Sequence, residues 1–305
     1  MLPAYPERLS LLRTALGLTI QDVSIVEMLR SPEGVRSAVD CLVCGGWGTQ
    51  RQFHPTFSFY ADEPRCQVLV AKDASDAVIG TAVSTQHGEV GWLGNIFVTP
   101  ELRGQGLGEK LTRQAIQRLR DKGCITIRLV ATQLGLPLYR TMGFRVENEY
   151  HELQGSGLGR QSTLSRDARP LLASDVDDAI EFDCMLTGED RSHLIRRLWP
   201  QGWCVTGSRG GVDGLVIPTP WGGEFALLRP QAAPEQGAHF LGLIRSIVGA
   251  SSELLVYPTS ENVIARRLLK ELGFTELRTM PRMVLGADRP WAPAGLWSIF
   301  SPAMG

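Results

Sequence analysis

The segment 103–108, which reads Arg-Gly-Gln-Gly-Leu-Gly, constrains the fold of this chain more than any other feature. It follows the apolar run Ile96–Val98 and precedes a stretch of helical periodicity, so it joins a buried strand to a helix. Three glycines at alternate positions let successive backbone N–H groups approach one anion, and the N-terminus of the helix adds partial positive charge. The segment predicts a phosphate-binding turn in a protein of the α/β class.

The spacing of these glycines excludes the two commonest phosphate loops. A dinucleotide site needs Gly-x-Gly-x-x-Gly, and a nucleoside triphosphate loop needs Gly-x4-Gly-Lys-Ser/Thr. Here Gly104, Gly106 and Gly108 alternate and position 109 is Glu. The segment instead resembles the Arg/Gln-x-x-Gly-x-Gly/Ala signature of the GNAT acetyltransferases, a family that uses acetyl-CoA.

This resemblance implies an acetyl-CoA site built largely from main-chain atoms. The pantetheine arm is expected to lie along the end of the strand Val90–Val98 like an extra strand, and the N–H of Ile96 is expected to face the thioester oxygen. The residues expected to bind the coenzyme are Ile96, Phe97, Val98, Arg103, Gly104, Gln105, Gly106, Leu107, Gly108 and Thr132.

Amide formation from a thioester needs a neutral amine, donors for the developing oxyanion and an acid for the departing thiolate. The pattern Leu-Tyr-x-x-x-Gly-Phe over 138–144 is similar to the one that places a tyrosine beside the coenzyme sulfur in many relatives. The resemblance therefore implies that Tyr139 is the general acid. Many relatives carry a glutamate as base on the strand before the glycine loop, but the aligned position here is Trp92.

The general base therefore stays unassigned. Glu89 and Asn95, beside and on the strand Val90–Val98, are the candidates for a base or for a group that orients water, and Asn95 can only do the latter. His54 and His87 are further candidates, from loops. The aromatic residues Trp47, Phe53, Phe57 and Phe59 either line an acceptor pocket or close the core, and the loop 46–55 is expected to lead toward the substrate.

The second half of the sequence repeats part of the first. Leu138, Gly143 and Phe144 recur 130 residues later as Leu268, Gly273 and Phe274, which indicates two copies of one fold. The second copy has Leu269 where the first has Tyr139. At the place of the glycine loop it reads Leu-Leu-Arg-Pro-Gln-Ala over 227–232, which cannot bind a pyrophosphate in the same way.

We therefore expect two GNAT-like domains, each with a mixed, mostly antiparallel sheet flanked by helices. The expected boundaries are 1–153 for the acetyl-CoA domain, 154–168 for a linker rich in Gly and Ser, and 169–305 for the second domain. The expected helices cover 3–17, 32–44, 107–122, 136–142, 175–186 and 264–272; the expected strands cover 68–72, 78–84, 90–98, 125–131, 169–172 and 254–257.

Bulk properties limit the partners. The net charge of the 305 residues is −1 without a basic run, which argues against nucleic acid, and no apolar stretch approaches the roughly twenty residues that cross a bilayer. A cytoplasmic protein is expected. Six scattered cysteines suggest neither a disulfide framework nor a metal site, and Cys41 and Cys44 are expected to pack on a helix.

These observations predict an N-acetyltransferase that moves an acetyl group from acetyl-CoA to the primary amine of a small molecule. Two alternatives remain open: a module that binds or senses acyl-CoA without turnover, and an enzyme that acetylates protein amines. The sequence does not identify the amine, the length of the acyl group or the oligomeric state.

Overall fold

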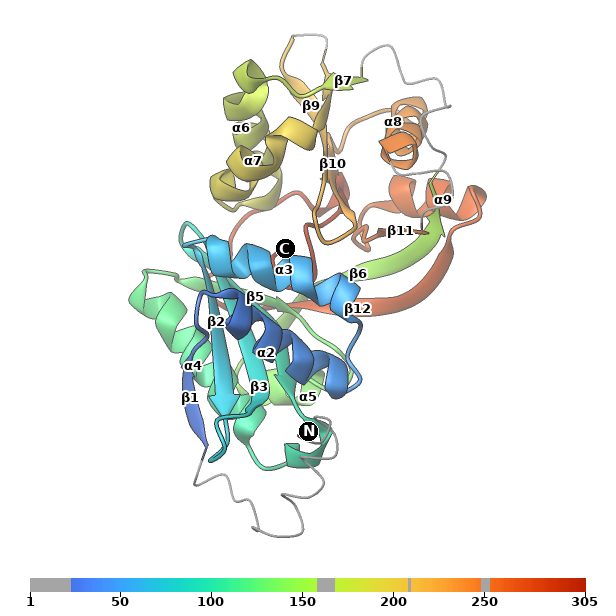
Figure 1. The fold of residues 1–305 in the computed structure, drawn as a ribbon. Helices are drawn as coiled ribbons and strands as arrows, with labels where there is room; N and C mark the ends of the chain where they lie inside the picture. Colours follow the sequence, from blue (N-terminus) through green and yellow to red (C-terminus); the bar gives the residue numbers. More distant parts are fainter. Residues whose placement is uncertain (1–22, 158–167, 208–209, 248–252) are drawn as a thin grey trace. The chain divides into compact units, whose positions relative to one another are not determined.

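The computed structural model describes residues 23–157, 168–207, 210–247 and 253–305 (Figure 1). The helix expected over 3–17 lies outside these residues. The chain divides into two compact units, the first formed by the described residues up to Gln86 with Leu93–Lys122 and the second by His87–Trp92 with Gly123–Gly305. Each unit is α/β, as the sequence predicts.

The first unit consists of one sheet with its helices. The strand order is β1-β2-β3-β4, with β2 antiparallel to both β1 and β3. Its elements are β1 (Ser24–Glu27), α2 (Pro32–Cys44), α3 (Gln50–Asp62), β2 (Cys66–Lys72), β3 (Val78–His87), β4 (Val90–Val98), a 3₁₀ turn (Pro100–Leu102) and α4 (Leu107–Asp121).

The helix α3 corrects the loop expected over 46–55. Thr49 caps it, since the Thr49 side chain accepts from the Gln52 N–H and the Gln52 side chain accepts in return from the Thr49 N–H at 3.1 Å. This Thr-x-x-Gln capping box is a helix start signal that the sequence contained. Pro55 lies inside the first two turns of the helix. The other expected elements of this unit are confirmed, including the buried face of α4.

The second unit contains two sheets. One has the strand order β5-β12-β6-β11, and the other has the order β13-β10-β9-β8-β7. The elements are β5 (Thr126–Val130), α5 (Leu136–Thr141), β6 (Arg145–Ser156), β7 (Ala168–Pro170), α6 (Val176–Thr187), α7 (Ser192–Leu198), β8 (Trp203–Thr206), β9 (Val212–Pro218), β10 (Glu224–Leu228), α8 (Pro234–Ile247), β11 (Glu253–Val256), α9 (Val263–Glu271), β12 (Thr275–Gly286) and β13 (Leu296–Ser298), with 3₁₀ turns at Ala173–Asp175, Trp199–Gln201 and Pro293–Gly295.

The two halves of the sequence exchange strands within this unit. The late strand β12 pairs with β5 on one side and with β6 on the other, both antiparallel, and β6 also pairs with β11. Figure 1 shows β6 and β12 as two long curved strands side by side. Gln154–Ser156, expected in a linker, are strand residues of β6. The division into domains at 153 and 169 stays a prediction.

The repeated sequence pattern corresponds to a repeated local structure. After α5, the N–H of Gly143 donates to Arg140 O and the N–H of Phe144 to Tyr139 O. After α9, Gly273 and Phe274 make the same two bonds to Lys270 and Leu269. Both glycines have φ in the left-handed region, 90° and 81°, where a side chain would be strained. The two helix-to-strand corners therefore have the same hydrogen-bonded geometry.

Candidate functional site

The glycine loop has the geometry of an anion site. Gly104 and Gly106 have φ of 75° and 84°, and Gly106 is the N-terminal cap of α4. Within the described part of the chain, none of the N–H groups of Gly104–Gly108 donates a hydrogen bond. A Cβ at either Gly104 or Gly106 would meet no atom within 4 Å, so the loop is open at both positions. A pyrophosphate fits such a site.

Arg103 fixes the start of the loop. Its Nε donates to Val98 O at 3.0 Å, and its guanidinium lies 5.4 Å from the centroid of the Phe97 ring. These contacts connect the last residues of β4 to the first residue of the loop. Arg103 therefore stabilises the turn between β4 and α4.

The strand β4 is irregular at Asn95. This residue has φ of 46°, which is unusual for a residue other than glycine. Its carbonyl accepts from Thr81 Oγ1 at 2.7 Å, and its side-chain amide donates to the hydroxyl of Tyr60 at 3.3 Å. The left-handed conformation interrupts the regular strand one residue before Ile96, whose N–H is the predicted oxyanion donor. These two hydrogen bonds fix both the carbonyl group and the side chain of Asn95.

Tyr139 lies on α5 and is buried, with its ring edge-to-face against Phe144 at 5.9 Å between centroids. Burial raises the pKa of its hydroxyl to about 12, so the phenol stays protonated at neutral pH. The ring is confined by Gly135, where a Cβ would come within 2.8 Å of it. Thr132 is exposed, and its hydroxyl accepts from the N–H of Gly135 at 3.1 Å. Its assignment to the coenzyme stays a prediction.

The candidates for the general base lie in different surroundings. Glu89 is exposed in the turn before β4 and forms an ion pair with Arg289. His54 is exposed on α3, not on a loop. His87 is fully buried at the end of β3, and its Nε2 lies 2.8 Å from Met304 O. Burial is the main reason that the pKa of His87 falls to about 4, so its imidazole is neutral at pH 7.

Trp92, at the position where relatives place a glutamate, is fully buried and donates from Nε1 to Glu189 Oε2 at 2.9 Å. Glu189 also accepts from Arg128 at 2.6 Å and lies 3.4 Å from Arg282. Arg282 in turn lies 2.8 Å from Glu147. Two arginines and two glutamates thus balance their charges inside the second unit.

This cluster keeps Glu189 ionised. Burial alone would raise the pKa of Glu189, but three neighbouring guanidinium groups outweigh it and lower the pKa to about 2. Those groups belong to Arg128, Arg191 and Arg282. A carboxylate with so low a pKa is a poor base, so the network holds Trp92 in position and does not accept the amine proton. The sequence pattern did not predict this cluster, although Arg128 interrupts an apolar strand.

The aromatic residues of the first unit form a chain of ring contacts. Trp47 stacks on Phe97 at 5.4 Å and meets Phe53 at 6.2 Å, and Phe53 meets Phe57 at the same distance. Phe57 and Phe59 are buried, whereas Trp47 and Phe53 are partly exposed. The first two therefore belong to the core, and the last two are the pair free to meet a ligand.

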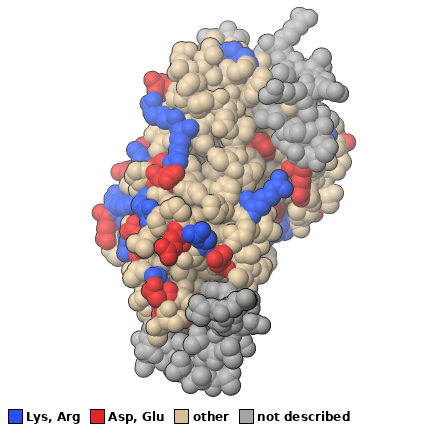
Figure 2. All heavy atoms as spheres, viewed as in Figure 1, with Lys and Arg blue, Asp and Glu red and all other residues tan. Residues whose placement is uncertain are grey.

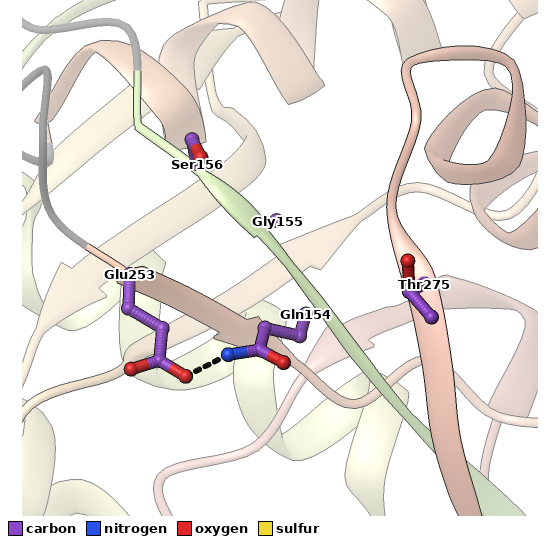
Figure 3. A pocket seen from close by; sticks show the side chains of 5 residues that line it. All are labelled: Gln154, Gly155, Ser156, Glu253 and Thr275. Carbon is purple, nitrogen blue, oxygen red and sulfur yellow. Dashed lines mark hydrogen bonds between the residues drawn. The ribbon is translucent and has the colours of Figure 1, made fainter.

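A small pocket of about 350 Å³ lies elsewhere, at the edge where β6, β11 and β12 meet (Figure 3). Gln154, Gly155, Ser156, Glu253 and Thr275 line it, and Gln154 donates to Glu253. None of the predicted site residues is among them. The pocket is therefore not formed by the residues that we expect to bind the coenzyme or to act in catalysis.

The face of the molecule drawn in Figure 2 carries both signs of charge. Figure 2 shows lysines and arginines interspersed with aspartates and glutamates on the face in view. No helix among the described residues is long and apolar enough to span a bilayer. In the same part of the chain, His, Cys, Asp and Glu nowhere gather in threes that could hold a metal ion.

Comparison with known proteins identifies relatives over part and over most of the chain. The Acetyltransferase (GNAT) family model matches residues 36–144. The chain is 24% identical over 219 residues to the uncharacterized N-acetyltransferase YitH of Bacillus subtilis, covering 70% of this chain and 76% of that protein. It is 38% identical over 65 residues to the thialysine N-epsilon-acetyltransferase of Sus scrofa, a match that covers 20% of this chain and 38% of that enzyme.

Solved structures share the fold over nearly the whole chain. A putative acetyltransferase from Pyrococcus horikoshii aligns with a TM-score of 0.77 at 16% identity, covering 94% of this chain and 98% of the other. A tandem GNAT protein from the clavulanic acid biosynthesis pathway aligns with a TM-score of 0.57 at 12% identity, covering 88% and 99%. The fold of two GNAT-like domains is thereby confirmed.

Proposed function

Because the chain carries an acetyltransferase domain of the GNAT family, we propose that it transfers the acetyl group of acetyl-CoA to the primary amine of a small molecule. The observation that carries this proposal is the glycine loop at the start of α4. The N–H groups of residues 104–108 make no hydrogen bond within the described residues, and Gly104 and Gly106 have open space at the Cβ position. Such donors suit the coenzyme pyrophosphate.

In the proposed reaction the neutral amine attacks the carbonyl carbon of the thioester directly. The N–H of Ile96 stabilises the oxygen as negative charge develops on it. When the carbon–sulfur bond breaks, Tyr139 donates its proton to the departing thiolate. A hydroxyl with a pKa of about 12 is protonated at neutral pH and therefore carries the proton that the thiolate takes up. The amine proton leaves to a base that remains unassigned.

Release of free thiol tests this proposal. The protein is incubated with acetyl-CoA and a panel of primary amines while free thiol is followed with a chromogenic disulfide, and the acetylated products are identified by mass spectrometry. Thiol release that depends on an amine supports the proposal. Tight binding of acetyl-CoA by calorimetry without turnover on any amine would instead support the acyl-CoA-binding alternative, and acetylation of proteins alone would support the protein-modifying one.

A further inference from the structure

A serine, a histidine and a glutamate form a hydrogen-bonded chain in the second unit, apart from every residue assigned above. Ser260 Oγ lies 3.0 Å from His151 Nε2, and His151 Nδ1 lies 2.8 Å from Glu276 Oε1. The three residues come from different elements: the loop between β11 and α9, the strand β6 and the strand β12. Three separate segments of the chain therefore bring one hydroxyl, one imidazole and one carboxylate into hydrogen-bonding distance in series.

The arrangement has the connectivity of an activated serine. In such a site, one imidazole nitrogen is the base and lies about 2.6–3.2 Å from the nucleophilic hydroxyl oxygen. The other imidazole nitrogen donates to a carboxylate oxygen at a similar distance, and this bond orients the ring. Both distances here fall in that range. The hydrogen bond from His151 is the main cause that lowers the pKa of Glu276, so this carboxylate is ionised at neutral pH.

The backbone around Ser260 is fixed by pairing with β6. The N–H of Ser260 donates to Glu149 O at 2.9 Å, and the N–H of His151 donates to Pro258 O at the same distance. The imidazole is almost wholly buried, whereas Ser260 is partly exposed. The nucleophilic residue is thus partly open to solvent, while the imidazole that serves as its base is sheltered.

Donors for an oxyanion lie next to this hydroxyl in the sequence. Ser260 lies three positions before the first residue of α9, and the N–H groups of Glu261 and Ile264 make no hydrogen bond within the described residues. The N-terminus of a helix favours negative charge. The geometry points to Ser260 as a nucleophile toward carboxylic esters of small acyl groups, with His151 as its base and Glu276 as the residue that positions the imidazole.

In the proposed step, Ser260 Oγ forms a bond to the ester carbonyl carbon while its proton passes to His151 Nε2. The bond from that carbon to the alcohol oxygen then breaks, and the alcohol leaves with the proton from His151. Water attacks the acyl-serine in the same manner, which releases the carboxylic acid and restores Ser260. No other reactant is consumed.

Labelling of the full chain with a fluorophosphonate tests the site. The Ser260 oxygen displaces fluoride from phosphorus, so intact mass and peptide mapping should show one adduct, located on Ser260. Ser260→Ala should abolish labelling, and His151→Gln should slow it at least a hundredfold. Glu276→Gln should slow it at least tenfold, with partial recovery in Glu276→Asp, which a merely structural role would not produce.

The chain offers an internal control in Ser58, whose Oγ lies 3.5 Å from His54 Nδ1 on the exposed face of α3. Ser58→Ala should leave labelling unchanged. If peptide mapping of the unaltered protein shows no adduct on Ser260, or one that forms no faster than at Ser58, the proposal is wrong. Thermal melting of each variant verifies that the fold is retained.

Discussion

The turn that leaves β10 is the predicted counterpart of the turn that leaves β4, yet the backbone N–H groups of the two turns differ in their hydrogen bonds. After β4, the N–H groups of Gly104–Gly108 remain without partners in the described chain. After β10, the N–H of Arg229 donates to Asp213 O, that of Ala232 to Arg229 O, and that of Ala233 to the side chain of Gln236. The second turn thus engages three of its own N–H groups, at Arg229, Ala232 and Ala233.

The edge of β10 that does not pair with β9 pairs with another strand of the same chain. Its residues Ala226 and Leu227 pair with Ser298 and Leu296 of β13, so a strand of the protein lies where an extended ligand would have to pair. Pro230 and Pro234, which have no N–H, remove two further donors. The comparison teaches that two turns of the same kind of fold differ in how many backbone donors they leave open, and we propose that only the turn with the open donors binds a ligand.

The largest expected effect comes from blocking the open donors. Gly106→Glu should lower the affinity for acetyl-CoA at least a thousandfold, because it places a carboxylate in the space meant for phosphate and strains a left-handed backbone position. Isothermal calorimetry with acetyl-CoA measures this.

Two variants are matched controls for this prediction. Gly123→Glu adds the same side chain at φ of 87°, also with nothing within 4 Å, at the other end of α4. Gln231→Glu adds a charge to the corresponding turn of the second half. Both should bind acetyl-CoA within about twofold of the unaltered protein. An equal loss of acetyl-CoA affinity in all three variants would show that the glycine loop is not part of the coenzyme site.

The second prediction concerns Glu224 on β10. Burial raises the pKa of this carboxyl to about 7, against an ordinary 4.5, so the folded chain keeps a proton that the unfolded chain loses. The free energy of unfolding should therefore fall as pH rises from about 4.5 to 7, by about 3 kcal/mol from this group. Urea unfolding of the protein and of Glu224→Gln at pH 5 and pH 8 isolates the effect. If the difference in unfolding free energy between the two proteins is the same at pH 5 and pH 8, the prediction is wrong.

A third prediction uses the contrast between Tyr139 and its counterpart Leu269. Tyr139→Phe removes the acid without changing the shape of the ring, so kcat should fall about a hundredfold while the affinity for acetyl-CoA stays unchanged. Steady-state thiol release and calorimetry on the same variant measure both quantities. A kcat within threefold of the unaltered protein would exclude Tyr139 as the acid.

The smallest expected effect lies at Gly135. A methyl group there would approach the Tyr139 ring within 2.8 Å, so Gly135→Ala should displace the ring by a few tenths of an ångström and lower kcat severalfold. In the Tyr139→Phe background the hydroxyl is already gone, and the same substitution should add nothing further. A double-mutant cycle of kcat values checks this; additive losses would show that Gly135 acts independently of Tyr139.

Local sequence signals predicted much of this fold. Ser31 with Pro32 marked the start of α2, and the repeated Gly-Phe ends of α5 and α9 indicated the internal repeat. The start of α3 was expected to be a loop, although the capping box at Thr49 is a helix start signal. Each of these features depends on residues three to five positions apart in the sequence.

Long-range contacts were beyond such reasoning. The insertion of β12 between β5 and β6 joins residues more than a hundred positions apart, and nothing in the periodicity of either strand specifies its neighbour. The buried ion cluster around Glu189 has the same origin, because Arg128 and Arg282 become its partners only through that pairing. Of the predicted site, the glycine loop has left-handed φ at Gly104 and Gly106. Its binding of the coenzyme and the roles of Tyr139, Glu89 and Asn95 stay predictions.

The position of β12 has a consequence for synthesis on the ribosome. β5 ends at Val130, but the strand that must join it begins at Thr275. At 5–20 residues per second, translation takes roughly 7 to 30 s to cover that interval. Throughout this time the nascent chain has a sheet edge without its final neighbour, so this protein should depend on chaperones that shield unpaired strands until translation is complete.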